Sequence, residues 1–199
     1  MATPYGHALM GLSLLNLCFP RPTALSNQSG LIMGGTLLVA LFPDLDFLPG
    51  LLIGQPSHFH QGPFHSLGLA VGLALAVGLI LILIKRSSSI IPVAGFVFIL
   101  ILSHLVMDYL SEDNRPPIGF PFFWPFSDQR VNSAVSIFPH AIRDITRPEF
   151  WRQNSLVFMV ESLLLWPIYL ATRLRLERVK INCRQGEVDR GTFGSYIKK

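Results

Sequence analysis

Histidine and aspartate side chains cluster, by sequence position, at the ends of apolar segments. Imidazole and carboxylate are the nitrogen and oxygen donors that zinc and similar divalent ions take. His104 and Asp108 lie four residues apart in an apolar segment, so both project from one face of a helix. Polar ligands in such a segment are costly, which makes the pair a functional candidate. The predicted metal ligands are His7, Asp44, His60, His65, His104 and Asp108.

These donors exceed what one ion needs. A tetrahedral site takes three or four ligands, so six indicate either two ions or one ion with additional acid–base groups. Asp44 and Asp46 follow an apolar segment, where extended chain would point both carboxylates to one side. We assign Asp44 as the ligand and Asp46 as the catalytic residue, either general base or orienter of a histidine; the reverse order is the alternative. A turn at Gly62–Pro63 would bring His60 and His65 towards the same ion.

Three other polar side chains are weighed separately. Glu161 lies inside the last apolar segment, where it either joins the site or neutralises a loop arginine such as Arg152. His58 and His140 are expected to be surface loop residues.

The composition is that of a membrane protein. Of 199 residues, 50% are hydrophobic and 14% charged, against about 25% charged in a soluble domain. The mean hydropathy of +0.46 agrees with this. Disorder, a disulfide-stapled mini-protein and a coiled coil are excluded. The sequence pI of about 9.4 is attributed to basic cytoplasmic loops, and no nucleic-acid partner is expected.

Five apolar segments must position the donors. The expected fold class is all-α: a polytopic membrane bundle of about five apolar helices with a metal site at one end. Thr3 is the expected N-cap of the first helix, with Pro4 at its first position. The first two segments are short for full spans. The segments are Pro4–Phe19, Gly30–Pro43, Leu67–Ile84, Ile90–Leu110 and Leu156–Leu174.

Alternating spans would place the metal end away from the cytoplasm. Eleven of the 16 Lys and Arg residues fall on the other side, which the positive-inside rule makes cytoplasmic, together with the C-terminus. Cys18 and Cys183 would lie on that reducing side. Met1–Phe19 holds no Lys or Arg, so no cleavable signal peptide is expected. The predicted localisation is multi-pass in the inner or plasma membrane.

Two further divisions of the chain are expected. Residues 1–174 form the membrane-embedded domain, and within it 111–154 is a loop rich in proline and aromatic residues that covers the site. Residues 175–199 form a basic, loosely ordered cytoplasmic tail.

Four motifs in order resemble the YdjM-type family of membrane-bound metal-dependent hydrolases, and a later Trp124-Pro125 also fits. The match runs from residue 6 to about 126. That family's middle block usually reads His-Arg-Gly-x-Thr-His-Ser; here Gln61 and Phe64 replace the Arg and Thr. A family contact between that Arg and an anionic substrate is therefore not carried over. The motifs are Gly6-His7, Pro43–Asp46, His60–Ser66 and Ser103–Asp108.

The resemblance implies an activity. The family is similar in turn to zinc phospholipases C and single-strand zinc nucleases. These enzymes are helical bundles that cleave phosphodiesters. The expectation is a hydrolase with one or two divalent ions, zinc foremost, and a metal-activated water. Its substrate would be an amphiphilic phosphoester, such as a phospholipid or lipid-linked phosphate, at the bilayer surface. The alternatives are a divalent-metal transporter or metal-binding membrane protein without catalysis, and a scaffold or degenerate hydrolase. Transport sites lie near the bilayer midplane between repeats, whereas these ligands lie at one end.

Overall fold

A computed structural model describes residues 2–19, 29–54, 60–114 and 116–196. Over these ranges the chain is all-helical, as predicted, with two isolated β-bridges and no strand. Short 3-10 helices precede α3 and α5. The helices are α1 Pro4–Cys18, α2 Ser29–Ala40, η1 Phe42–Asp46, α3 Phe47–Leu52, α4 Leu67–Leu83, η2 Ser87–Ser89, α5 Ile90–Tyr109 and α6 Phe150–Tyr196.

Two helices that lead into the candidate site begin with side-chain caps. Thr3 Oγ1 accepts a hydrogen bond from Gly6 N at 3.4 Å, with Pro4 in the first turn, which confirms the predicted start of α1. Ser66 Oγ likewise accepts from Leu69 N at 3.1 Å and caps α4. Each cap fixes where its helix begins, close to His7 in α1 and next to His65 before α4.

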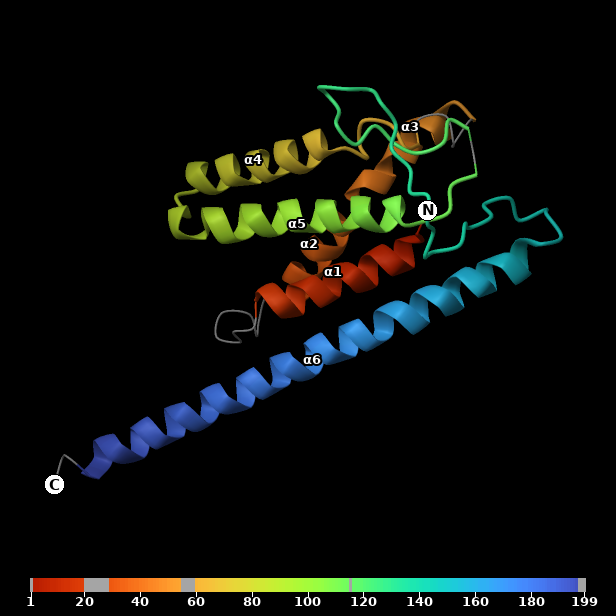
Figure 1. The fold of residues 1–199 in the computed structure, drawn as a ribbon. Coiled ribbons are helices and arrows are strands. Elements are labelled where there is room, and N and C mark those ends of the chain that lie inside the picture. The colour runs from red at the N-terminus through yellow and green to blue at the C-terminus, as the bar shows by residue number, and fades with distance from the viewer. Residues whose placement is uncertain (1, 20–28, 55–59, 115, 197–199) are drawn as a thin grey trace.

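The helices bring distant parts of the chain to one end of the bundle. α4 and α5 run side by side in opposite directions, and α1 packs against both α5 and α6. α2 crosses behind and contacts α1 and α5 (Figure 1). The first residues of α1 and α4, the last residues of α5 and the bend after α2 therefore meet at the same end.

Among the described residues, fewer helices have the length and composition of a membrane span than the five apolar segments predicted. By length and composition, α5 and the Phe150–Val179 part of α6 are long and apolar enough to cross a bilayer. A third candidate is the pair Gly30–Ala40 and Phe42–Leu52, bent by 57°. The second segment thus bends instead of ending at Pro43, and α4, at 17 residues, falls just short. Five spans are not confirmed.

Large apolar side chains on the outer faces are exposed. Leu83 is 71%, Ile91 85% and Leu163 74% exposed. Such faces are costly in water and suit a lipid environment, which agrees with the composition.

The segment between α5 and α6 packs on the start of α4. Leu67 N donates to Phe122 O at 2.8 Å and Gly68 N donates to Trp124 O at 3.1 Å, so two first-turn donors of α4 are satisfied. A Cβ on Gly68 would lie 2.4 Å from Trp124 O, so this approach requires glycine. The role of 111–154 as a cover stays a prediction.

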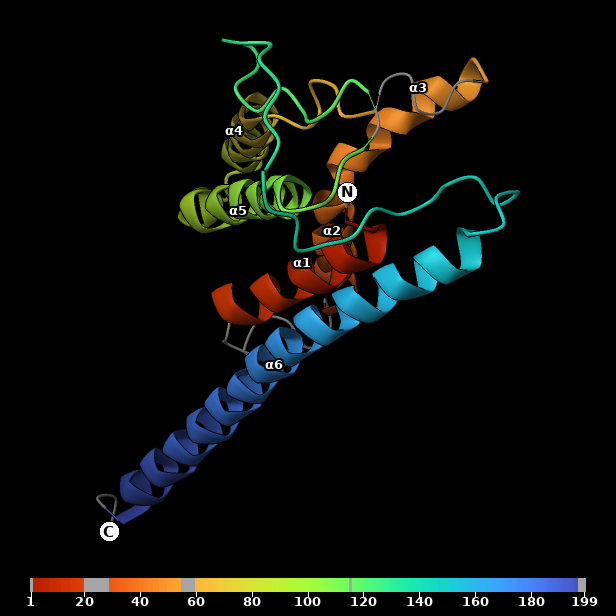
Figure 2. The same ribbon diagram turned by 45° about the vertical axis from the view of Figure 1, so that its right-hand side comes forward.

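The C-terminal segment differs from expectation. α6 runs on to Tyr196 and projects beyond the bundle (Figure 2), where a loosely ordered tail was expected. The first part of this segment, Arg173–Lys180, holds Arg, Leu and Glu residues that favour helix, and Arg173 pairs with Glu177 one turn on at 3.4 Å. The domain boundary at 174 stays a prediction.

Candidate metal centre

Four donor atoms from three parts of the chain converge in the interior. His65 Nε2 lies 3.4 Å from both His104 Nε2 and Asp108 Oδ2. His104 Nε2 lies 3.3 Å from Asp108 Oδ2. Asp44 Oδ1 lies 3.8 Å from each histidine Nε2. Apart from the partly buried Asp44, these residues are at most 4% exposed.

The distances from the two histidine nitrogens to each other and to the carboxylate oxygens suit a divalent ion. With metal–ligand bonds of about 2.0–2.2 Å, tetrahedral geometry separates neighbouring donors by about 3.3–3.6 Å. The observed 3.3–3.8 Å lies close to that range. Two imidazoles and two carboxylates are also a donor set that zinc and related ions accept.

The ring of His104 is held with Nε2 inward. Its Nδ1 lies 2.9 Å from the carbonyl oxygen of Ala40, the last residue of α2, so Nδ1–H donates outward. This bond assigns the tautomer and leaves the Nε2 lone pair facing the other donors. His65 is arranged in the same sense, because its Nδ1 lies 3.0 Å from Asp46 Oδ2 while Nε2 faces inward.

His7 completes the inner wall from α1. Its ring stacks on that of His104 with centroids 3.7 Å apart, and its Nε2 lies 3.4 Å from Asp108 Oδ1. His7, Asp44 and His104 also each offer a ligand atom within 4.8 Å of the others. Asp108 therefore faces His7 with one oxygen and the four-donor set with the other, an arrangement suited to one ion or to a bridged pair.

Unpartnered polar atoms mark this cluster. Burying a polar atom without a hydrogen bond costs about 1–3 kcal/mol, and the orphaned atoms here belong to the predicted ligands. The His65 Nδ1 contact with Asp46 does not have hydrogen-bonding geometry. A cation would satisfy the carboxylates and the ring nitrogens that face the donor set, so these residues fit a metal, whereas His65 Nδ1 faces Asp46. The atoms are His7 Nδ1 and Nε2, Asp44 Oδ2, His65 Nδ1, and Asp108 Oδ1 and Oδ2.

His60 lies at the edge of the cluster. Its Nδ1 bonds Asp46 Oδ1 at 2.7 Å, and its Nε2 accepts from Arg143 Nη2 at 2.6 Å. It still offers a ligand atom within 4.8 Å of Asp44 and His65. Because both ring nitrogens are engaged, the geometry favours an orienting role for His60, and its predicted place among the ligands stays a prediction.

The two aspartates do not share a face, contrary to the expectation of extended chain. Phe42–Asp46 is a 3-10 helix, in which two residues turn through about 240°. Asp44 consequently meets His65 at Nε2, whereas Asp46 meets it at Nδ1. Asp46 also accepts from Gln61 N at 3.0 Å. This geometry favours the orienting alternative for Asp46 over the general base, and its catalytic role stays a prediction.

Side chains that sequence reasoning passed over hold the outer layer. Gln61 Nε2 donates to Asp113 Oδ2 at 3.2 Å, and Arg130 Nη2 donates to the Gln61 carbonyl at 3.0 Å. Arg143 bonds His60, as given above. No spacing in the sequence indicates these contacts, because Asp113, Arg130 and Arg143 come from the irregular segment between α5 and α6.

Glu161 is placed outside the cluster. Its carboxylate, 0% exposed, accepts from Thr3 N at 2.6 Å and from Thr3 Oγ1, and so caps the start of α1. A Cβ on Gly6 would lie 2.9 Å from Glu161 Cδ, which explains the glycine that precedes His7. Neither prediction for Glu161, membership of the site or pairing with Arg152, matches these contacts.

His140 also lies outside the cluster. His140 is partly buried and its Nδ1 bonds Glu112 Oε2 at 2.8 Å, with a side chain 27% exposed. It lies in the irregular segment and in none of the metal-ligand groups. His58 lies outside the described residues.

Electrostatics at the cluster favour a cation. Burial lowers the pKa of the His65 imidazole, but the carboxylates of Asp108, Asp44 and Asp46 outweigh burial and raise that pKa well above its usual value. Positive charge is therefore stabilised among the three carboxylates, and a divalent ion would supply it while displacing the proton.

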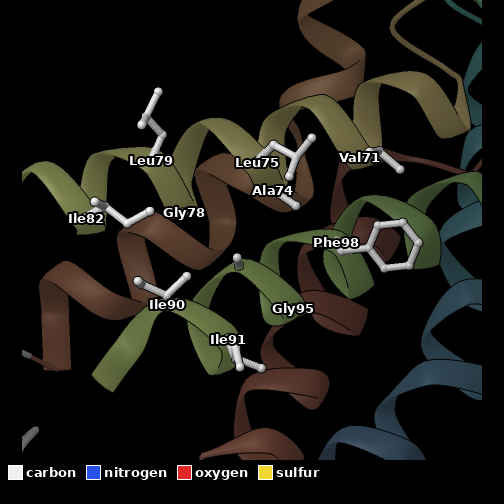
Figure 3. A pocket seen from close by; sticks show the side chains of 11 residues that line it. Val71, Ala74, Leu75, Gly78, Leu79, Ile82, Ile90, Ile91, Gly95 and Phe98 are labelled. Atoms are coloured by element: carbon white, nitrogen blue, oxygen red, sulfur yellow. The ribbon is translucent and has the colours of Figure 1, made fainter. Parts of the chain in front are cut away.

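An apolar groove lies apart from this cluster. It has a volume of about 510 Å³ and runs between α4 and α5, lined by residues such as Leu75, Leu79 and Ile91 (Figure 3). No lining residue carries a titratable or metal-binding side chain. The groove therefore has no part in the metal chemistry.

Comparison with known proteins gives one match. A family model described as "YdjM inner membrane protein" matches residues 1–178. No curated protein matches the chain, and no solved structure does.

Proposed function

The chain belongs to the YdjM inner membrane protein family, and from this premise we propose that it is a membrane-bound, metal-dependent hydrolase. The observation that carries the proposal is the convergence of His65 Nε2 and His104 Nε2, 3.4 Å apart, with oxygens of Asp108 and Asp44 that each lie 3.3–3.8 Å from both nitrogens. Zinc is the ion we propose, held by His65, His104, Asp44 and Asp108, with His7 as a further ligand or the ligand of a second ion.

Residues of this chain would hold and shape the reacting centre. A divalent ion supplies Lewis acidity, which polarises a substrate oxygen and lowers the pKa of a water molecule. The Ala40 carbonyl and Asp46 keep the two histidine rings turned with Nε2 inward. Asp44, 15% exposed at its side chain, marks the side from which a substrate reaches the donors.

The proposed substrate is an amphiphilic phosphoester. The donors of α5 lie in its last two turns, at the end of an apolar helix, where lipid headgroups would lie. Exposed aromatic side chains of the neighbouring segment, including Phe123 and Phe126, suit contact with the bilayer interface. The similarity to zinc phospholipases inferred from the motifs points to the same bond type.

The proposed topology is multi-pass, with the metal end away from the cytoplasm and the C-terminus inside. Eleven of the 16 basic residues lie on the opposite side if the five apolar segments alternate. Transport of a divalent metal is the alternative function. It is favoured less because the donors cluster at one end of the helices, whereas transport sites lie near the midplane.

Metal analysis and a substrate screen test the proposal together. Detergent-purified protein should retain about one or two zinc ions per chain and hydrolyse a phosphodiester or phospholipid. Chelation should abolish turnover and zinc should restore it. Asp108→Asn is the matched inactive variant, because it removes the charge of a carboxylate whose two oxygens together face three histidines.

The outcomes separate the alternatives. Protein that binds zinc, hydrolyses none of these esters and carries zinc across the membrane of a proteoliposome is a transporter. Protein that binds no divalent ion is neither, and the proposal fails.

A further inference from the structure

His60 and Gln61 are held between the candidate metal centre and the segment that joins α5 to α6. On the inner side, His60 Nδ1 and Gln61 N both bond the carboxylate of Asp46, at 2.7 and 3.0 Å. On the outer side, Arg143 bonds His60 Nε2 at 2.6 Å and Arg130 bonds the Gln61 carbonyl at 3.0 Å. The dipeptide therefore couples the segment to Asp46.

The backbone of this dipeptide needs such support. Gln61 has φ of 61°, a left-handed conformation that costs a non-glycine residue free energy unless its surroundings hold it. Its side chain is fixed by Asp113, 52 residues away in sequence. The contacts from Asp113 and Arg130 hold Gln61 N towards Asp46.

Asp46 transmits this arrangement to a ligand. Its Oδ2 lies 3.0 Å from His65 Nδ1, on the ring side opposite the donor set. At that distance the carboxylate attracts the ring nitrogen electrostatically, and loss of a carboxylate that orients a ligating imidazole usually weakens metal binding 10–100-fold. Residues that hold Asp46 and His60 in place therefore affect the affinity for the ion.

We propose that Arg143 is a positioning residue for the metal centre, acting through His60 and Asp46 on His65. This inference rests on the metal-binding part of the proposed function and is independent of the reaction catalysed. A guanidinium is a donor only and stays charged. Its bond to His60 Nε2 makes that nitrogen the acceptor, so Nδ1 carries the hydrogen that His60 donates to Asp46.

This series of contacts, from Arg143 through His60 and Asp46 to His65, is called the relay below, and it fixes the position of Asp46. With Nδ1–H of His60 and N–H of Gln61 donating, each oxygen of Asp46 has a fixed donor. Asp46 is then held beside His65 without rotating into the donor set. Removing Arg143 frees the His60 ring to change tautomer or turn, and Asp46 loses one of its restraints.

Zinc affinity of the full-length protein in detergent micelles tests the relay. Arg143→Ala should weaken zinc binding about 10–100-fold, and Arg143→Lys should recover part of the loss by restoring a cationic donor. Arg147→Ala is the matched control, because Arg147 is an exposed arginine of the same segment. It should bind zinc like the unaltered protein.

A double substitution separates a relay from an independent effect. If Arg143 acts through His60, the pair Arg143→Ala and His60→Ala should bind zinc no more weakly than His60→Ala alone. Losses that multiply would overturn the proposal. So would wild-type zinc affinity in Arg143→Ala.

Two further results are also decisive. Unchanged zinc affinity with loss of inorganic phosphate binding to the zinc-loaded protein would make Arg143 a substrate residue and overturn the relay. If the unaltered protein binds no zinc, the proposed function and the relay both fail. If it binds zinc and only the Arg143 effect is missing, the relay alone fails.

Discussion

His104→Ala is expected to remove most of the metal affinity while the protein still inserts in the membrane. The substitution deletes the nitrogen that lies 3.3–3.8 Å from donors of Asp108, His65 and Asp44. Loss of a residue that only orients a ligand weakens binding about 10–100-fold. Loss of the ligand itself should therefore exceed about 100-fold.

This loss has a measurable effect on stability. A ligand at 100 times its Kd stabilises the folded state by about 2.7 kcal/mol. At the same zinc concentration, a variant with 100-fold weaker binding would gain only about 0.4 kcal/mol. The assay is the zinc-dependent rise in thermal midpoint of detergent-purified protein, with bound zinc measured in parallel. Each variant is compared with its own metal-free form, because His104 also stacks on His7.

His140→Ala is the matched control. His140 is bonded to Glu112 and lies outside the metal-ligand groups. Its variant should keep the full zinc-dependent rise. A zinc-dependent rise in His104→Ala equal to that of the unaltered protein would refute the assigned donor set.

Four other expectations concern neighbouring features. Asp44→Asn should weaken zinc binding more than Asp46→Asn, because Asp44 faces Nε2 of two histidines whereas Asp46 faces Nδ1 of His65. Titration of both variants with zinc measures the difference, and the reverse order would exchange the two roles. Gly6→Ala should lower the unfolding free energy by about 1–3 kcal/mol, because the added Cβ would meet Glu161. Gly34→Ala on α2 is the control and should not lower it, because a Cβ there meets nothing within 4 Å. Equal thermal midpoints for the two variants would contradict this packing. Zinc binding should tighten from about pH 6 to 8 with release of about one proton per ion, because the raised pKa of His65 means that this imidazole must lose a proton to bind the ion. Calorimetry in buffers of different ionisation enthalpy counts the released protons. No release would argue against His65 as a ligand. A reporter fused after Lys199 should read cytoplasmic, and an extracytoplasmic signal would overturn the proposed orientation.

Local rules were sufficient for several features of this protein. Thr3 with Pro4 predicts the start of α1, and an i, i+4 pair in an apolar run places His104 and Asp108 on one helix face. Composition alone identifies a membrane protein, because a soluble domain of this length does not carry so few charges. These inferences succeed because they depend on residues within about one helical turn of each other.

Conformation at a single bend decided the roles of the two aspartates. The motif names Asp44 and Asp46 without distinguishing them, and extended chain would have aimed both at the ion. The 3-10 turn instead places them on opposite nitrogens of His65. Propensity does not select between an extended and a 3-10 path here, because the bend is stabilised by packing of α2 and α5 around it.

Contacts over long sequence separations were decided by the tertiary structure alone. Arg143 reaches His60 across 83 residues and Glu161 reaches Thr3 across 158. Hydrophobic periodicity carries no information about which irregular segment lies over which helix end. The sequence therefore determined the membrane class, the helices and the kinds of donor atom, all properties of local chemistry. Which nitrogen faces the ion, and which side chains hold it there, depend on pairs of residues that only folding brings together.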